Sequence, residues 1–137
     1  MIKLPDYTYR VTEVIRVVDG DTVDVMIDMG MYQYVRKRIR ITQIDTEELR
    51  GGTAETKIEA NLAKERMHEL LQRGTVYLKT YMDAEGKYGR LLGDLYVLED
   101  NGLIDISKTL VQEGYMKGDI LLTEKAKENV VYVEYQL

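Results

Sequence analysis

The chain has 137 residues, a hydrophobic content of 45%, a charged content of 31% and a formal net charge of −5. These values fit one globular domain with its own core, and they exclude a disordered chain or a protein that coats nucleic acid by bulk positive charge. The chain has no cysteine and a single histidine, which excludes disulfides, thiolate metal sites and multi-histidine zinc sites. A metal ion would need oxygen ligands, which favours calcium, magnesium or manganese.

No segment is long and apolar enough to predict a membrane helix, so we expect no membrane partner. The N-terminal stretch MIKLPDYTYRVTEV lacks the apolar core of a secretory signal. We therefore expect a cytoplasmic protein, or one encoded by a phage or other mobile element. A secreted protein whose leader has been removed is the alternative.

In chain order, β-branched residues and turn glycines first predict three strands. We expect strands over Val11–Val18 and Thr22–Asp28 around a turn at Gly20, and a third over Tyr32–Ile44 after a turn at Gly30. The paired glycines of ELRGGTAE then indicate a loop. Two successive hairpins of this kind form a meander.

A helix is predicted from Ala54 to Arg73, with Thr53 as its N-cap and Gly74 at its C-terminal end. His68 lies beside the apolar stripe and is expected at the surface. The stripe itself follows the helical period and consists of Ala60, Ala63, Met67, Leu70 and Leu71.

Two further strands are predicted over Thr75–Tyr81 and Arg90–Leu98, followed by a short helix that Asp105 caps and Gly114 ends. Leu122–Asn129 could be helical, and Val130–Tyr135 is β-prone and could pair with the edge of another chain. This order predicts a mainly β fold with α-helices, a five-stranded barrel of the OB type with two to three helices. We expect a single domain over residues 1–137.

Acidic and basic residues gather in three short stretches that carry candidate chemistry. VVDGDTVDV places three aspartates in a strand pair, although aspartate is a poor strand former. RIRITQIDTEE places an arginine five residues before an aspartate, with a glutamate three residues after it. GKYGR places basic residues in a glycine-flanked turn.

Hydrolysis of a phosphodiester needs groups of these types. A divalent cation, held by carboxylates, neutralises a phosphate oxygen and stabilises the charge of the transition state. Arginine binds the remaining oxygens with a planar fork, and a further carboxylate accepts a proton from the attacking water. DGD alone is a weak signal because it also makes a good turn, whereas the three stretches together are far more specific.

The three stretches resemble, in order and roughly in spacing, the motifs of the staphylococcal nuclease (thermonuclease) family. The resemblance runs from about Tyr9 to Lys117 and rests on DGDTV, on Arg40 five residues before DT, and on KYGR. It implies an OB-fold barrel with helices that hydrolyses DNA and RNA with calcium and leaves 3′-phosphate ends. Magnesium and manganese are the alternative metals.

The resemblance also implies a role for each matching residue. Asp21 and Asp45 correspond to carboxylate ligands of calcium, and Thr46 to a ligand through its backbone carbonyl. Glu48 corresponds to the general base that acts on a water molecule. The phosphate-binding positions fall on Arg40, Arg90, Lys87 and Tyr88, of which the last two match positions that contact a terminal phosphate of a bound nucleotide.

The sequence departs from the family pattern at three places. Glu47 stands where the family has a proline, which removes a backbone constraint and adds a negative charge near the site. The two tyrosines that flank the base in the family fall at Ile120 and Leu122, so base stacking there would depend on Tyr115. Residues from about 118 to 137 form a divergent C-terminal tail.

Several charged residues also have a simpler, structural interpretation. Asp19 is expected to shape the turn or to support the metal ligands without binding the metal itself, and Asp24 is expected to face solvent. Arg36 and Arg38 are expected on a solvated strand face, which strand alternation extends to Arg40.

Three function classes remain at this point. The first is a nuclease that acts as a monomer on DNA or RNA, in single-stranded or frayed form. The second is a non-catalytic module of the same fold that binds nucleic acid or protein. The third is a protein-binding structural part of a larger assembly.

Overall fold

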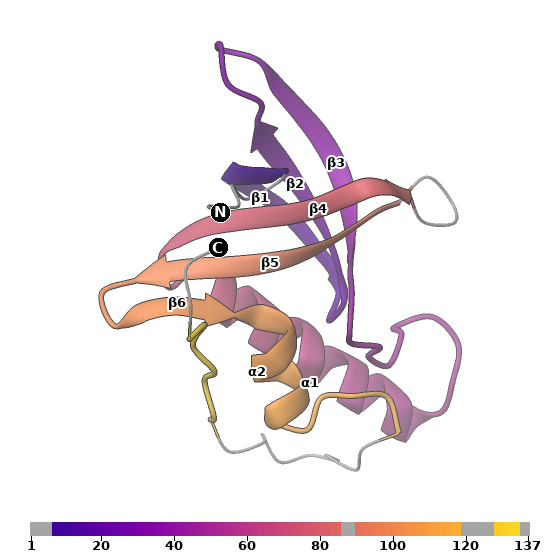
Figure 1. The fold of residues 1–137 in the computed structure, drawn as a ribbon. Coiled ribbons are helices and arrows are strands. Elements are labelled where there is room, and N and C mark those ends of the chain that lie inside the picture. The colour runs from indigo at the N-terminus through magenta and orange to yellow at the C-terminus, as the bar shows by residue number, and fades with distance from the viewer. Residues whose placement is uncertain (1–6, 86–89, 119–127, 135–137) are drawn as a thin grey trace.

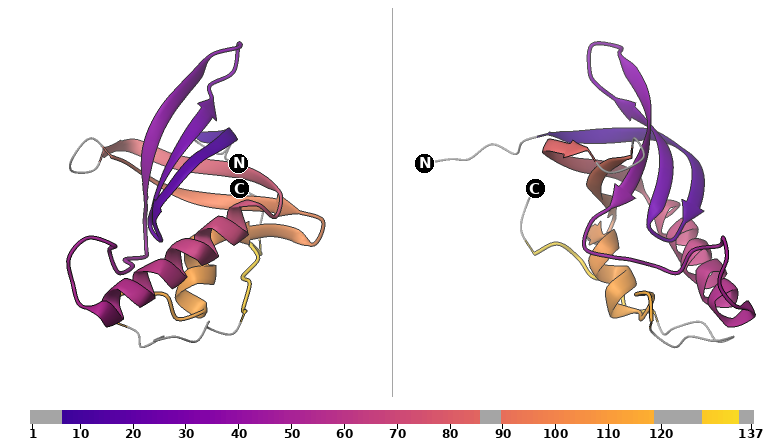
Figure 2. Two further views of the ribbon diagram at one scale, coloured as in Figure 1. Left: turned by 180° about the vertical axis from the view of Figure 1, so that it is seen from behind. Right: turned by 90° about the vertical axis from the view of Figure 1, so that its right-hand side faces the viewer.

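The computed structural model describes residues 7–85, 90–118 and 128–134, and it shows a β-barrel with two helices beneath one end (Figures 1 and 2). The strands and helices, in chain order, are β1 (Thr8–Asp19), β2 (Thr22–Asp28), β3 (Tyr34–Ile41), α1 (Ala54–Leu71), β4 (Thr75–Glu85), β5 (Leu91–Glu99), β6 (Gly102–Asp105) and α2 (Ile106–Gln112). No helix in the described ranges has both the length and the apolar character needed to span a membrane.

The sheet closes on itself through one parallel strand pair. Its order is β3-β2-β1-β4-β5-β6, with antiparallel neighbours, and Ile39–Ile41 of β3 pair in parallel with Leu91–Gly93 of β5. This pair closes β1 to β5 into a five-stranded mixed barrel, which confirms the predicted OB-type fold. β6 was not predicted, and it pairs with the second half of β5.

The apolar pattern of each strand sets which side chains enter the barrel. In β2 the inward residues alternate, and Val23, Val25 and Ile27 are all buried. In β1 the inward valines, Val11 and Val17 among them, recur every third residue, because the pairing with β2 shifts register at three irregularities. The bulges therefore let β1 keep its apolar residues inside although its sequence lacks a strict period of two.

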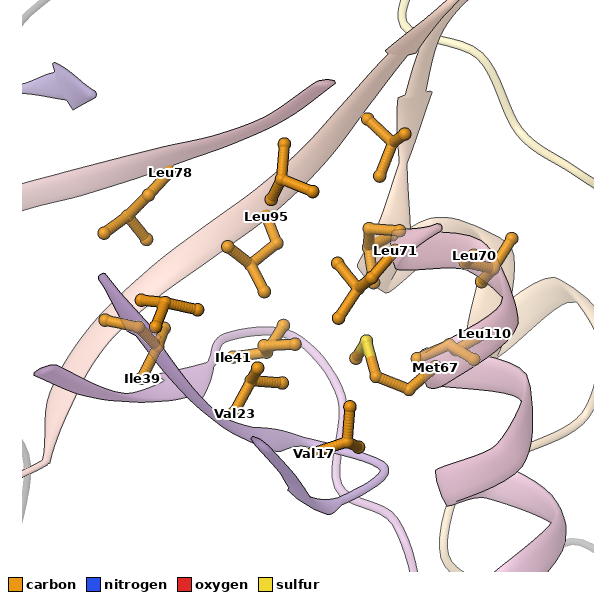
Figure 3. Packing of buried hydrophobic residues seen from close by; sticks show 14 of the residues in the cluster. Val17, Val23, Ile39, Ile41, Met67, Leu70, Leu71, Leu78, Leu95 and Leu110 are labelled. Atoms are coloured by element: carbon orange, nitrogen blue, oxygen red, sulfur yellow. The ribbon is translucent and has the colours of Figure 1, made fainter. Parts of the chain in front are cut away.

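The lower end of the barrel is filled by the buried stripe of α1. Thr53 caps this helix as predicted, and its hydroxyl accepts a hydrogen bond of 3.2 Å from the backbone N–H of Thr56. All five residues of the predicted stripe are buried, and His68 is exposed as expected. Figure 3 shows Met67 and Leu71 of α1 facing Val23 and Ile41 of the barrel.

Several predicted boundaries differ from the structure, among them those of β3 and α1. The third strand is shorter than Tyr32–Ile44, because Tyr32 and Gln43 have positive φ angles, 59° and 65°, that a strand does not allow. α1 ends at Leu71 rather than at Arg73. Gly74 serves close packing, since a Cβ there would lie 2.0 Å from the carbonyl oxygen of Leu98.

The short second helix forms as predicted, with Asp105 as its N-cap, and the chain then returns to β6. The backbone of 131–133 pairs with β6: Asp105 N–H donates to Val131 O at 2.9 Å, and Val133 N–H donates to Leu103 O at 2.8 Å. The β-prone tail thus pairs within its own chain. The helix expected over Leu122–Asn129 falls almost entirely outside the described residues.

Candidate active site

Two acidic segments that are distant in sequence meet at the lower end of the barrel. The first is the turn between β1 and β2, and the second is the loop of residues 42–53 between β3 and α1. Asp21 joins them: its Oδ2 accepts a hydrogen bond of 3.0 Å from the backbone N–H of Thr46, and its Oδ1 accepts one of 3.0 Å from the hydroxyl of Thr22. Asp21 is 5% exposed, so these bonds fix the direction of a largely desolvated carboxylate.

The guanidinium of Arg40 lies between the two predicted acidic ligands. Its Nη2 is 3.5 Å from Oδ2 of Asp21 and 3.1 Å from Oδ1 of Asp45. Its Nη1 donates to the carbonyl oxygens of Ile41 at 2.5 Å and Ile44 at 2.8 Å. The two carboxylates therefore converge on Nη2 of Arg40, which lies between them, and the loop backbone holds the arginine in this place.

Gly20, in the middle of DGD, is required by the closeness of these segments. A Cβ at this position would lie 2.7 Å from Cβ of Ala63 in α1 and 2.9 Å from Oγ1 of Thr46. Real side chains do not approach so closely, so any larger residue would separate the turn from the loop and the helix.

Asp45 itself is held from the opposite side by the segment that follows α2. Lys117 N–H donates to the carbonyl oxygen of Asp45 at 2.5 Å, and Asp45 N–H donates to Sδ of Met116 at 3.3 Å. The side chain of Asp45 remains 63% exposed. Its backbone is thus fixed while its carboxylate stays open to solvent, as a group that meets a ligand should be.

Asp19 and Glu48 add further negative charge at the edge of this cluster. Asp19 accepts a hydrogen bond of 3.4 Å from the backbone N–H of Leu49, so it supports the loop as well as the turn. Burial raises the pKa of Asp19 above its ordinary value, and the nearby carboxylates of Asp21 and Glu48 raise it further. Glu48 is exposed and accessible to a water molecule.

The remaining basic positions are only partly described. Arg90 directly precedes β5, and Leu92, two residues later, is the partner of Arg40 in the parallel pair. Arg90 thus lies immediately before the strand that pairs with the Arg40 segment of β3. Lys87 and Tyr88 lie outside the described residues.

The donor set is compatible with calcium but incomplete by itself. Among the residues that the structure describes, no three acidic or histidine side chains are grouped closely enough to hold a metal ion. Two convergent carboxylates and a backbone carbonyl would leave several of calcium's six to eight oxygens to water and substrate. The hydroxyl of Thr46 is fully buried and has no hydrogen-bond partner, which marks this loop as a place with an unmet polar group.

Asp24 corrects one sequence-based expectation. It does not face solvent but is 4% exposed, and it forms a two-point ion pair with Arg38 at 2.7 and 3.0 Å. The Arg38 hydrogen bonds lower the pKa of this carboxyl despite its burial. Arg36 and Arg38 are exposed as expected, yet both are within 4 Å of Asp24, Arg36 at 3.9 Å.

Tyr115 also differs from the role that base stacking would require. It is 4% exposed and belongs to the hydrophobic core, so it offers no ring face to a nucleotide. The positions of the family's tyrosine pair, Ile120 and Leu122, lie outside the described residues.

Sequence reasoning missed the polar network that anchors the start of the loop. The hydroxyl of Thr42 donates to Oδ1 of the buried Asp94 on β5. The carbonyl oxygen of Thr42 accepts a hydrogen bond of 2.9 Å from Ser107 in α2. No local pattern reveals these contacts, since the partners are 52 and 65 residues away along the chain.

Comparison with known proteins identifies the family to which this chain is similar. A family model described as staphylococcal nuclease homologue matches residues 38–136, which is most of the chain. A search of curated proteins gives no match. The matched range contains the loop with Asp45, Thr46 and Glu48, and the DGD turn lies before it.

Proposed function

The chain belongs to the staphylococcal nuclease family, and on that premise we propose that it is a metal-dependent nuclease that hydrolyses phosphodiester bonds of DNA or RNA. The observation that carries the proposal is that the carboxylates of Asp21 and Asp45, from two separate segments, meet at the guanidinium of Arg40, whose Nη2 is 3.5 and 3.1 Å from them. A non-catalytic module that only binds nucleic acid would gain nothing from these carboxylates, because they repel the phosphates of the ligand.

In this proposal Asp21, Asp45 and the carbonyl of Thr46 would hold calcium, with magnesium or manganese as alternatives. When bound, such a cation neutralises a phosphate oxygen and stabilises the charge that develops in the transition state. The hydrogen bonds that Asp21 accepts from Thr22 and Thr46 keep its carboxylate aimed at the site without a ligand present. Such preorganisation avoids a cost of reorientation at the moment of reaction.

The chain's own residues would perform the rest of the reaction. Glu48 would accept the proton of a water molecule as the water oxygen bonds to phosphorus and the bond from phosphorus to the 5′ oxygen breaks. The 5′ oxygen leaves with the bonding electrons and takes a proton from solvent water. The products are a 3′-phosphate end and a 5′-hydroxyl end. Arg40 and Arg90 stabilise the negative charge on the phosphate oxygens, and loss of one such donor typically costs about 100- to 1000-fold in rate.

The test is digestion of a 5′-labelled single-stranded DNA and of an RNA of the same sequence. Calcium, magnesium and manganese are supplied in turn, with a chelator as control. We expect cleavage that calcium supports and the chelator abolishes, with 3′-phosphate ends identified by their resistance to polymerase extension until a phosphatase is added. Cleavage that persists in chelator would overturn the proposal, as would binding of the oligonucleotide without cleavage in any of the metals.

A further inference from the structure

The hairpin of β2 and β3 extends well beyond the barrel, and we call residues 28–38 the β2–β3 arm. Both views in Figure 2 show it projecting away from the helices. The barrel closes only at Ile39–Ile41, so in the part of the chain that the structure describes, residues 34–38 of β3 pair with β2 alone. The arm thus presents an open strand edge and an outer face continuous with the active site.

The tip of the β2–β3 arm exposes large side chains that a folded core would normally bury. Met31 is 92% exposed, Tyr32 94% and Tyr34 55%. Two of these residues, Met31 and Tyr32, also have positive φ angles of 54° and 59°, which are unfavourable for any residue with a side chain. Exposure combined with strain indicates a tip shaped for contact rather than for stability.

The tip is nevertheless an ordered turn. Met29 N–H donates to the carbonyl oxygen of Gln33 at 2.8 Å, and Gln33 N–H donates to that of Gly30 at 2.9 Å. Oδ1 of Asp28 accepts a further bond of 2.8 Å from Gly30 N–H. The tyrosine rings are therefore carried on a fixed backbone, which lowers the entropy lost when they bind a ligand.

The outer face of β3 connects the tip to the active site. Alternation places Tyr34, Arg36, Arg38 and Arg40 on that face, and they form what we call the β3 track. Arg40 lies six positions along the strand from Tyr34, a span of about 20 Å. On β2 the residues paired with Arg36, Arg38 and Arg40 are Met26, Asp24 and Thr22, so β2 adds no positive charge beside them.

We propose that the β3 track and the tip of the arm bind the single strand of nucleic acid that the active site cleaves. Tyr32 and Tyr34 stack on bases, and Arg36 binds a phosphate upstream or downstream of the scissile bond. Arg38 stays paired with Asp24. That the bound strand runs toward Arg40 rests on the proposed nuclease function. Binding by the arm itself does not require cleavage.

Charge and continuity favour this occupant over others. The protein carries a net charge of −5, and the β3 track is a local concentration of positive charge that suits a phosphate backbone. Arg38 and Arg40 are partly neutralised by aspartates. The side chain of Arg36, in contrast, is 63% exposed and lies 3.9 Å from Asp24, the longest ion-pair distance in the track. A second copy laid along the same track would bring arginines against arginines. The track also ends at Arg40, whose guanidinium lies at the convergent carboxylates.

The test measures binding in chelator, where no metal-dependent cleavage occurs, by anisotropy of labelled single-stranded DNA of about 12 nucleotides. Base–aromatic stacking predicts that Tyr32→Ala and Tyr34→Ala each weaken binding by about 5- to 100-fold. Arg36→Ala should also lower the salt slope of the binding constant by about 0.7, the value for one phosphate contact of a single strand. Val111→Ala and Lys57→Ala, at exposed sites on α2 and α1, are the matched controls and should bind as wild type.

A second measurement separates this inference from the nuclease proposal. The cleavage of a dinucleotide-sized substrate, too short to span the β3 track, should be the same in wild type and in Tyr32→Ala. Loss of binding in the tyrosine variants supports the arm even if wild type never cleaves. Unchanged DNA binding in both tyrosine variants overturns the proposal for the arm, even if wild type cleaves. The proposal is also overturned if the protein is a dimer that Tyr32→Ala converts to a monomer with no effect on DNA binding.

Discussion

The backbone N–H of Thr46 donates a 3.0 Å hydrogen bond to Oδ2 of Asp21, and this bond ties the loop before α1 to the turn between β1 and β2. The two partners are 25 residues apart in the chain. Because the same carboxylate lies 3.5 Å from Arg40, a shift of the turn would displace the acidic and the basic parts of the candidate site together.

Gly20→Ala tests this connection. The added methyl would meet Ala63 at 2.7 Å and Thr46 at 2.9 Å, so the turn must move away from both. We expect a loss of about 1–3 kcal/mol in the free energy of unfolding, measured with urea, and a fall in nuclease rate. Ala63→Gly alone should cost about 1 kcal/mol through helix propensity. In the double variant, the loss of unfolding free energy should be smaller than the sum of the two single losses. Glycine at position 63 removes the closest contact of the added methyl group.

Glu48→Gln tests the proposed general base. The side chain is exposed, so its amide should leave the folded structure intact while it removes the proton acceptor. We expect the calcium-dependent rate to fall by about 100- to 10,000-fold with unchanged thermal unfolding. Glu47→Gln, the neighbouring residue, is the matched control and should keep the rate within a few-fold. Equal rates in both variants would assign the proton transfer to another group.

Asp24→Asn tests the buried ion pair with Arg38 through its pH dependence. The Arg38 hydrogen bonds lower the folded-state pKa of Asp24 below 3.8, so the charged form is stabilised by folding. The pair therefore contributes stability above pH 3.8 that is lost as the pH falls through the folded-state pKa. In urea unfolding we expect the variant to be less stable than wild type by about 1–3 kcal/mol at pH 6. This difference in the free energy of unfolding should become smaller as the pH falls below 3.8. Asp100→Asn, in an exposed turn, should show no such gap at any pH.

Arg66→Met tests a second buried pair, which holds α1 to the segment after α2. Arg66 and Glu113 meet at 2.7 and 2.8 Å, with side chains 6% and 1% exposed. Removal of the arginine leaves a buried carboxylate with the N–H of Asn129 as a remaining donor, and we expect a loss of about 3–5 kcal/mol.

Two comparisons separate pairing from side-chain volume at Arg66. Arg66→Met combined with Glu113→Leu should recover more than half of the lost stability, since no unpaired charge remains. Arg10→Met breaks the largely exposed pair with Asp28 and should cost less than about 1 kcal/mol. A single-variant loss as small as that of Arg10→Met would mean that the buried pair contributes little.

The elements with strong local signals could be predicted from the sequence. The alternating residues of β2 and the capped, amphipathic α1 gave correct positions because each signal lies within the element itself. The short β6 has no such signal, since it forms only when β5 and the tail supply its neighbours. The third strand was predicted too long because nothing in its composition shows that Tyr32 and Gln43 adopt positive φ.

The candidate site was predictable in part for the same reason. The motif residues Asp21, Arg40 and Asp45 could be selected together, and the structure brings them together. Asp24 was misjudged because its partner, Arg38, lies 14 residues away on the next strand and only the strand register pairs them. The supports from Met116, Lys117 and Asp94 depend on the closed barrel, which no short stretch of sequence encodes.

The backbone bonds between residues 131–133 and β6 also bear on solubility. Without that segment, β6 would offer unpaired N–H and carbonyl groups along its outer side, and such an edge is a template for intermolecular strand addition. Tyr132 also lays its ring over Gly102, where a Cβ would approach to 3.2 Å, so this cover is fitted to the hairpin beneath it. The pairing of residues 131–133 with β6 therefore protects this edge from fibril-like self-assembly, independently of the chemistry at the carboxylates.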